Sequence, residues 1–360
     1  LSRYVGWGGL ADAFDLDKEN WRAEYAELKE VLTPEEYEAA RASTLNAHYT
    51  SPTVIHAMYE ALENMGFESG NILEPSMGVG NFFGCLPESM QNSRLYGVEL
   101  DSITGRIAKQ LYPKADITVA GFETTDRRDF YDVAIGNVPF GQYQVNDRAY
   151  NRLGFSIHDY FFAKTLDQVR PGGVIAFVTS RYTMDKQSPE VRKYIAQRAE
   201  LLGAIRLPNN AFKANAGTDV VSDIIFLQKR DRLVDIEPEW VHLATDENGI
   251  RMNSYFVSNP EMVLGDMQMI SGAHGPESAC IPYDDAELGD LLQDAIQNIH
   301  AEITEFELDD LEAEDEDLSI PADPSVRNFS YTVVDGKLYF RENSRMNPVE
   351  VSMTAENRIK

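Results

Sequence analysis

The sequence predicts an α/β fold, with a mainly parallel, twisted sheet and helices on both faces. Three observations predict it. Short apolar runs of strand length alternate with stretches of helix length through the first two thirds of the chain. A glycine turn follows the first of these runs, as in nucleotide-binding α/β domains. The last two runs, 201–207 and 221–227, are suited to an antiparallel hairpin.

The individual elements follow from the same patterns. Thr33-Pro34 predicts a helix start with Thr33 as N-cap, and residues 52–65 predict a second helix. We expect strands near 71–74, 94–99, 115–119, 131–136, 173–179, 201–207 and 221–228, and helices near 81–90, 101–111, 156–169 and 188–199. After residue 232 we expect strands at 236–243 and 252–257, a helix at 286–306, and a hairpin turned by Asp335-Gly336 between 331–334 and 337–340.

Composition indicates a soluble chain of about two domains. It has 360 residues and 43% hydrophobic content, and no apolar run approaches the roughly 20 residues that span a bilayer. Cys85, Cys280 and the six histidines show no disulfide framework and no metal-ligand spacing, so we expect no metal and a cytoplasmic location. Leu1 at the start and Lys360 at the end predict a piece of a longer polypeptide.

Changes in the alternation of strands and helices, and in charge, predict three regions. These are an N-terminal helical extension over 1–45, a central domain over 46–231, and a C-terminal α+β region over 232–360 that includes an acidic linker. The formal net charge of -27 is unfavourable for binding nucleic acid, because phosphate contacts need Lys and Arg. The charge is uneven, however: 302–317 holds ten acids and no base, whereas 181–213 holds seven bases and three acids.

A polar tetrapeptide follows the apolar run 131–136. Asn137 offers a side-chain carbonyl, residue 138 a backbone carbonyl, and Phe140 a flat ring. Pro139 stiffens the turn and favours extended geometry at Val138, which fixes the direction of that carbonyl. Two acceptors beside an aromatic platform suit the exocyclic amine of an extruded base. An isolated tetrapeptide of this kind is more often a simple turn at the end of a strand, so its context decides.

That context lies upstream. Strand 71–74 leads into a turn in which Gly78 and Gly80 allow positive φ and close approach of the backbone to a ligand. The spacing differs from Gly-x-Gly-x-x-Gly, so a nicotinamide dinucleotide is disfavoured. The next strand ends at Glu99, a carboxylate placed to bind both ribose hydroxyls of a nucleoside. Taken alone, Glu99 would more often be a helix-capping or solvated acid.

Together these motifs resemble the S-adenosylmethionine-dependent DNA adenine-N6 methylases, over roughly residues 45–230. The resemblance implies a Rossmann-like class I methyltransferase fold, with a seven-stranded sheet ending in an antiparallel hairpin. It implies S-adenosylmethionine as cofactor and assigns catalysis to Asn137, Val138, Pro139 and Phe140. It implies cofactor contacts from Tyr49, Thr50, Glu74, Pro75, Ser76, Gly78, Gly80, Asn81, Phe82, Glu99, Leu100, Phe122, Glu123 and Asn137.

Two positions depart from the pattern of these methylases. Val138 stands where they carry proline, and Gly121 stands where many carry an acid that binds the cofactor's adenine. Phe122 remains available to stack on the adenine, and Glu123 is the candidate replacement for the missing acid.

The order of the motifs resembles the gamma arrangement, in which target recognition lies C-terminal. We expect substrate contacts from Phe140, Tyr143, Arg181, Lys186, Phe212 and Lys213. The run from Leu1 to Leu10 and the run from Arg341 to Met346 further resemble the methylase region of large methylase and helicase proteins of conjugative elements and phages. That resemblance implies DNA and a helicase part of the same polypeptide as partners, and protection of DNA from restriction.

Two alternatives stay open. The same chemistry serves an RNA base or a protein glutamine as acceptor. Alternatively, the chain is a non-enzymatic scaffold with a cofactor-binding fold inside a larger assembly. This alternative rests on Val138, Gly121 and the acidic charge.

Overall fold

The computed structural model describes residues 6–8, 10–44, 50–212, 221–272, 275–304, 319–323, 325–342 and 345–349. None of the helices in these ranges is long and apolar enough to cross a membrane. The helices are α1 Arg22–Val31, α2 Pro34–Ser43, α3 Pro52–Asn64, α4 Asn81–Gly84, α5 Ser102–Leu111, α6 Ile157–Gln168, α7 Tyr182–Asp185, α8 Glu190–Ala196, α10 Ser254–Ser258 and α11 Leu288–Ile296. The strands are β1 Asn71–Glu74, β2 Arg94–Glu99, β3 Asp116–Val119, β4 Tyr131–Asn137, β5 Val169–Ser180, β6 Ala199–Leu207, β7 Ser222–Lys229, β8 Leu243–Thr245, β9 Arg251–Asn253, β10 Asp266–Gly272, β11 Gly275–Ile281, β12 Ile320–Pro321, β13 Tyr331–Val334, β14 Lys337–Glu342 and β15 Arg345–Pro348.

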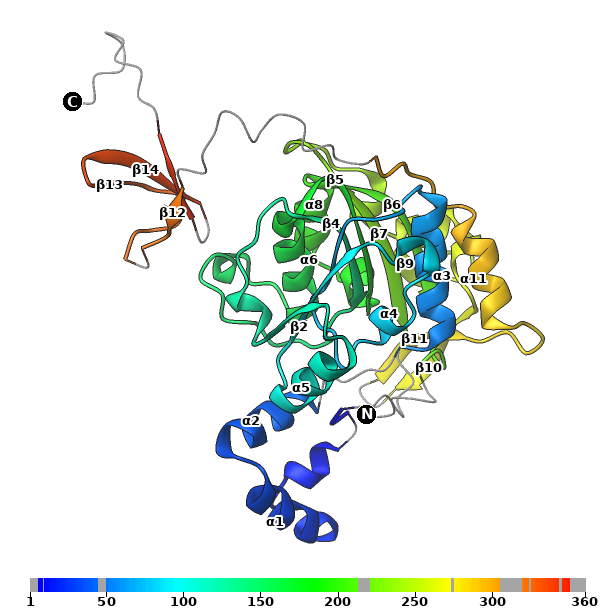
Figure 1. The fold of residues 1–360 in the computed structure, drawn as a ribbon. Helices are drawn as coiled ribbons and strands as arrows, with labels where there is room; N and C mark the ends of the chain where they lie inside the picture. Colours follow the sequence, from blue (N-terminus) through cyan, green and yellow to red (C-terminus); the bar gives the residue numbers. More distant parts are fainter. Residues whose placement is uncertain are drawn as a thin grey trace. The chain divides into compact units, whose positions relative to one another are not determined.

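A seven-stranded sheet in the order β3-β2-β1-β4-β5-β7-β6 organises the chain. Strands β1 to β5 pair in parallel, and β7 runs antiparallel to both β5 and β6. In Figure 1, α6 and α8 lie on one face of this sheet and α3 with α11 on the other. The predicted fold class is confirmed, and so is the predicted terminal hairpin.

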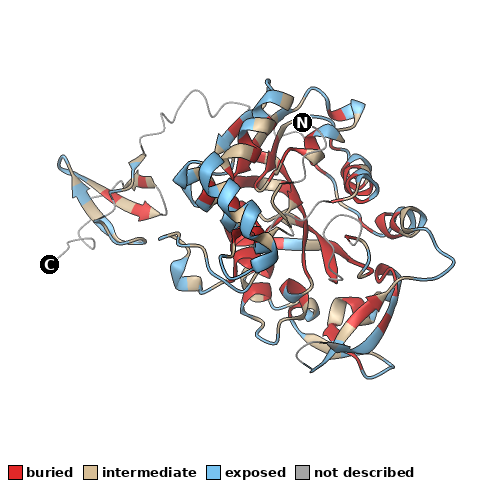
Figure 2. Ribbon diagram, turned by 90° about the horizontal axis from the view of Figure 1, so that it is seen from below, coloured by how far each residue is buried: buried red, intermediate tan, exposed pale blue. Residues whose placement is uncertain are grey.

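The core lies in the central strands. Runs such as Val133–Ile135 in β4 and Val174–Val178 in β5 are entirely buried, and Figure 2 shows the sheet as the buried centre of the fold. Because helices cover both faces, these strands are continuous apolar runs rather than alternating ones. For this reason the positions of the central strands could be predicted from the sequence.

Helix starts follow local chemistry. Thr33 caps α2 through a complete capping box with Glu36, as the sequence predicts. Ser51 caps α3 and Pro52 occupies its first turn. The predicted helix at 81–90 is too long: α4 ends at Gly84, and only the short 3-10 turn Glu88–Met90 follows.

The prediction of a strand at 252–257 is wrong. Asn253 ends β9, and its side-chain oxygen accepts the N–H of Tyr255 (2.9 Å), which starts the short helix α10. The helix predicted at 286–306 is too long: α11 covers Leu288–Ile296, and residues 297–304 are not helical. The hairpin of β10 and β11 (Asp266–Gly272 and Gly275–Ile281) was not predicted.

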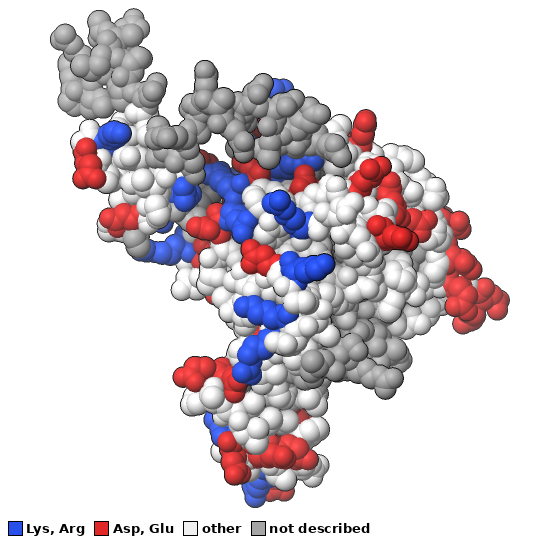
Figure 3. All heavy atoms as spheres, in the orientation of Figure 1, with Lys and Arg blue, Asp and Glu red and all other residues white. Residues whose placement is uncertain are grey.

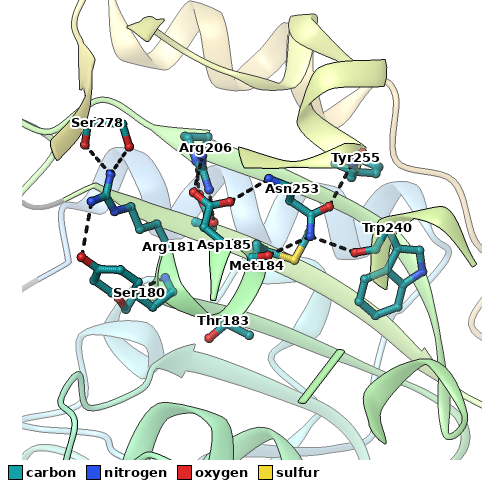
Figure 4. Close-up of polar contacts among 12 residues, drawn as sticks. Ser180, Arg181, Thr183, Met184, Asp185, Arg206, Trp240, Asn253, Tyr255 and Ser278 are labelled. Atoms are coloured by element: carbon teal, nitrogen blue, oxygen red, sulfur yellow. Dashed lines mark hydrogen bonds and ion pairs between the residues drawn. The ribbon is translucent and has the colours of Figure 1, made fainter. Parts of the chain in front are cut away.

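The chain divides into two compact units. Unit 1 comprises residues 1–145 and 155–304, and unit 2 comprises 146–154 and 305–360. Unit 1 thus extends past the predicted boundary at residue 231. A buried polar network, drawn in Figure 4, helps to attach residues 238–281 to the sheet. Within it Arg206 pairs with Asp185 (2.9 Å), and Asp185 accepts the N–H of Asn253 (2.9 Å).

Unit 2 contains a small sheet in the order β12-β15-β14-β13. Asp335 (φ 49°) and Gly336 (φ 78°) both have positive φ between β13 and β14, the geometry of a two-residue hairpin turn. The Asp335-Gly336 prediction is therefore confirmed.

Candidate active site

Three strands of the sheet end in polar residues at one edge. Glu74 ends β1, Glu99 ends β2 and Asn137 ends β4, and β1 pairs with both of the others. All three line one cavity of about 540 Å³. A cavity of this size at the carboxyl ends of parallel strands is where α/β proteins bind small ligands.

The glycine turn after β1 forms one wall. Gly78 (φ 55°) and Gly80 (φ 87°) adopt conformations that other residues rarely take. A side chain at Gly80 would collide with the Tyr112 ring, so this position also requires glycine for packing. The space beside Gly78 is open, which lets a ligand approach the backbone.

Glu99 is held by this turn. Its carboxylate accepts the N–H of Gly78 and the N–H of Asp101, each at 2.8 Å. Burial raises the pKa of Glu99 to about 7, although these two N–H groups act to lower it. Each carboxylate oxygen keeps a further lone pair, so Glu99 can still accept the hydroxyls of a ribose.

Glu74 is a second buried acid beside it. Burial first, and then the nearby Glu99 carboxylate, raise the pKa of Glu74 well above its ordinary value. Its Oε2 atom is buried without a hydrogen-bond partner. A polar atom in that state is expected to have a partner in the functional complex, because an unsatisfied buried group costs free energy.

The predicted catalytic loop begins in this cavity. The Asn137 amide Nδ2 donates to the buried Thr50 hydroxyl (3.1 Å), which brings together residues 87 positions apart. The Val138 N–H bonds to the Val178 carbonyl (3.0 Å) and continues the β4–β5 pairing by one residue. Pro139 lines the cavity beside Asn137, and Phe140 is half-buried just beyond it.

The segment after β3 supplies an aromatic wall. Phe122 is buried and stacks on Phe161 of α6, with ring centroids 4.8 Å apart. Both rings line the cavity. A side chain at Gly121 would overlap the Glu123 carboxylate, so this carboxylate occupies the space beside residue 121.

The N-terminal region contributes a wall that the sequence analysis did not predict. Gly6, Ala42 and Ser43 line the cavity together with the strand ends. No local signal in the run Gly6-Trp7-Gly8 placed it beside the sheet. Other lining residues that were not among the predicted site residues are Met77, Val79, Val98, Thr104, Ala120, Val145, Ile157 and Phe161.

Most predicted site residues fall in this one place. The lining includes Thr50, Glu74, Pro75, Ser76, Gly78, Asn81, Phe82, Glu99, Leu100, Phe122, Glu123, Asn137, Pro139 and Tyr143. Among the predicted residues that the structure describes, Gly80, Val138, Phe140, Arg181, Lys186 and Phe212 are not part of it. Tyr49 and Lys213 lie outside the described residues.

Three predicted substrate contacts lie against the protein itself. Lys186 pairs with the buried Asp159 (2.8 Å), and Arg181 donates to the side chain and carbonyl of Ser278. Phe212 is buried. Their roles toward a substrate stay predictions.

Charge is unevenly distributed over unit 1. Figure 3 shows lysine and arginine side chains in the middle of one face, and acidic ones gathered along its edge. No cluster of three or more His, Cys, Asp or Glu suited to a metal ion occurs within the described ranges.

Comparison with known proteins gives one family and several relatives. Residues 32–237 match the model of a family described as N-6 DNA methylase. The defense against restriction protein B of Escherichia phage P1 is 28% identical over 239 residues, which are 64% of this chain and 10% of that protein. The type II methyltransferase M.CvrRI of Paramecium bursaria Chlorella virus XZ-6E is 35% identical over 92 residues, 26% of this chain and 24% of that protein. The chain therefore spans a tenth and about a quarter of the length of these two relatives.

Among solved structures, the methyltransferase subunit of a type I restriction-modification system from Streptococcus thermophilus is 18% identical, with a TM-score of 0.43. The match covers 57% of this chain and 52% of that chain.

Proposed function

Because the chain belongs to the N-6 DNA methylase family, we propose that it transfers a methyl group from S-adenosylmethionine to the N6 amine of adenine in DNA. One observation carries the proposal. Asn137, which begins the predicted catalytic loop, lines the same cavity as Glu74 and Glu99 and bonds to Thr50 there. Residues predicted for the amine and for the cofactor thus meet at one edge of the sheet.

The cavity fits the cofactor in its donor set. Glu99 supplies acceptors for two ribose hydroxyls, and Phe122 an aromatic surface for the adenine. Glu123 places a carboxylate beside Gly121, where it can accept the adenine amine. The unpartnered Oε2 of Glu74 is suited to a polar group of the methionine part, and the Thr50 hydroxyl to its carboxylate.

The chain's own residues then activate the acceptor. When bound, S-adenosylmethionine supplies an electrophilic methyl group. The amide oxygen of Asn137 and the backbone carbonyl of Val138 accept the two amine hydrogens, which concentrates the lone pair on the nitrogen. Phe140 supports the extruded base by stacking. Positioning and charge stabilisation account for this chemistry without a covalent intermediate.

Valine at position 138 is compatible with this role. The residue acts through its backbone carbonyl, and Pro139 restricts its conformation whatever side chain it carries. The Val138 side chain is buried and its N–H is fixed to β5, so the main chain here is held rigidly.

We also propose that the methylation protects DNA from restriction. The phage P1 relative is named for defence against restriction, and that protein is about ten times longer than the matched segment. We therefore propose that the chain works together with further parts of a longer polypeptide, a helicase part among them.

The test is the Asn137→Ala variant. We expect it to lose transfer of labelled methyl groups to DNA by at least about 100-fold, the usual range for removing a transition-state acceptor. Cofactor affinity measured by calorimetry should stay within a few-fold of wild type. The exposed Asn92→Ala is the matched control and should retain full activity. Undiminished methylation in Asn137→Ala would refute the assignment.

The same assay distinguishes the proposed function from the two alternatives, which are methyl transfer to another acceptor and a non-enzymatic scaffold. Wild-type protein is incubated with DNA, RNA and protein, and the labelled product is identified. If RNA or a glutamine side chain is labelled and DNA is not, the acceptor is wrong. If millimolar S-adenosylmethionine does not bind, the scaffold reading replaces the enzyme.

A further inference from the structure

Residues 6–8 and 10–44, the N-terminal segment, contain a small hydrophobic core of their own. Phe14 and Tyr37 are buried in it, and Trp7 and Trp21 pack against it. Trp7 meets Phe14 edge to face, with ring centroids 5.6 Å apart. This core explains how the segment folds, but not why it lies on the sheet.

Two polar contacts attach the segment to α5 and to Asp101, the N-cap residue of that helix. The Trp7 indole N–H donates to the Asp101 carboxylate (3.2 Å), and Arg106 pairs with Glu36 (2.6 Å). Helix α2 accordingly packs beside α5, as Figure 1 shows. Because the Arg106 side chain is 62% exposed, that pair contributes little. Asp101 is fully buried, so its bond to Trp7 is the stronger anchor.

Asp101 connects this anchor to the cavity. Its carboxylate also accepts the N–H of Thr104 (2.9 Å), and its own N–H donates to Glu99 (2.8 Å). Glu99, Leu100 and Thr104 all line the cavity, on either side of Asp101 in the sequence. A displacement of Asp101 therefore reaches the acid that is placed to bind the ribose.

The same segment also forms part of the cavity wall. Gly6 is adjacent to Trp7, and Ala42 and Ser43 lie at the end of α2. We propose that Trp7 is a positioning residue, which holds the N-terminal segment (6–8 and 10–44) as one wall of the cofactor site and acts through Asp101 on Glu99. This inference rests on the proposed function, since it takes S-adenosylmethionine as the ligand.

The first test is Trp7→Phe in the full chain. Phenylalanine keeps the packing on Phe14 but lacks the N–H. We expect the Kd of S-adenosylmethionine to rise about fivefold, the ratio that corresponds to one ordinary hydrogen bond. Trp21→Phe changes the same residue type in the same core, and Trp21 has no bond to Asp101. It should leave the Kd unchanged.

A ligand comparison separates positioning from general loosening of the fold. Trp7→Phe should weaken adenosine but not 2′,3′-dideoxyadenosine, because only adenosine has the hydroxyls that Glu99 accepts. An equal loss for both nucleosides would overturn the action through Glu99.

A second variant tests the wall if Trp7→Phe does not fold. Ala42 is exposed on α2 and lines the cavity, so Ala42→Leu adds volume there and keeps a good helix former. We expect a Kd at least tenfold higher, about the effect of losing 1.4 kcal/mol of binding. Ala26→Leu, on an exposed position of α1, is the control.

The outcomes are distinct from those for the proposed function. If the wild type binds S-adenosylmethionine and both Trp7→Phe and Ala42→Leu bind it with the wild-type Kd, the inference is wrong and the proposed function stands. Absence of cofactor binding in the wild type would instead refute the proposed function itself.

Discussion

We predict that Glu99, the buried acid that ends β2, makes the proposed nucleoside binding depend on pH. Burial raises the pKa of Glu99 to about 7 from an ordinary value of 4.5, a difference that corresponds to about 3 kcal/mol against the ionised form. Ribose hydroxyls donate to the ionised carboxylate and favour it. A bound nucleoside should therefore lower the pKa of Glu99 and release a proton near neutral pH.

The magnitude follows from the ionised fraction of Glu99. With a pKa of about 7, that fraction is about one in eleven at pH 6 and about ten in eleven at pH 8. If only the ionised form binds, the Kd of a nucleoside rises about tenfold from pH 8 to pH 6. Adenosine is the suitable probe, because it carries the ribose but no amine or carboxylate that titrates in this range.

The raised pKa of Glu99 also makes the stability of the fold depend on pH, in the direction opposite to that of nucleoside binding. Its pKa in the folded protein lies above its value in the unfolded chain, so between pH 4.5 and 7 the folded state binds a proton that the unfolded state has lost. The contribution of Glu99 to the free energy of unfolding therefore falls by about 3 kcal/mol as pH rises through this window. The contribution of Glu99 to stability is therefore smaller at the higher pH, at which we expect the nucleoside to bind more tightly.

Calorimetry with adenosine at pH 6, 7 and 8 checks the prediction. Glu99→Gln cannot ionise and should bind weakly and equally at each pH. The exposed Glu88→Gln should keep the tenfold dependence of the wild type. A wild-type Kd that is constant from pH 6 to 8 would refute the reasoning. An unaltered dependence in Glu99→Gln would assign the titration to another acid, with Glu74 the nearest candidate.

Three further predictions concern buried charges and the adenine. Arg206→Leu leaves Asp223 buried without its bidentate partner and should lower the free energy of unfolding by about 4 kcal/mol in urea denaturation; a loss below about 1 kcal/mol would contradict this. Lys186→Met should cost about 3 kcal/mol in the same assay, because it leaves the Asp159 carboxylate buried without a cation. Glu123→Gln should reduce the preference for adenosine over inosine about tenfold in competition binding, since a carboxylate accepts from an amine and repels a carbonyl oxygen; an unchanged preference would remove Glu123 from the adenine site.

The sheet and its polar edge were predictable because their signals are local. The buried strands are apolar runs, and Glu74, Glu99 and Asn137 each stand at the end of one. Parallel strands bring their carboxyl ends to one edge, so three separate motifs could be assigned to one site from their order alone. The glycine turn was equally readable, since positive φ at Gly78 and Gly80 needs that residue type.

Contacts between remote segments were not predictable in this way. The bond from Trp7 to Asp101 joins residues 94 positions apart, and no periodic pattern encodes it. The pairing of Arg206 with Asp223 crosses two strands, and in the sequence each reads as an isolated charge. At Asn253 a side-chain cap ended a strand that the apolar pattern alone would have extended.

The two departures from the methylase pattern have different physical consequences. At Val138 the atom that we propose to act belongs to the backbone, so what matters is the conformation imposed by Pro139 rather than the side chain. At Gly121 the functional group belongs to a side chain, and its loss needs compensation. The Glu123 carboxylate lies where a residue 121 side chain would begin and lines the cavity, so we propose that it takes the role of that acid. If Glu123 serves the adenine in this way, glycine at position 121 does not count against a functional cofactor site.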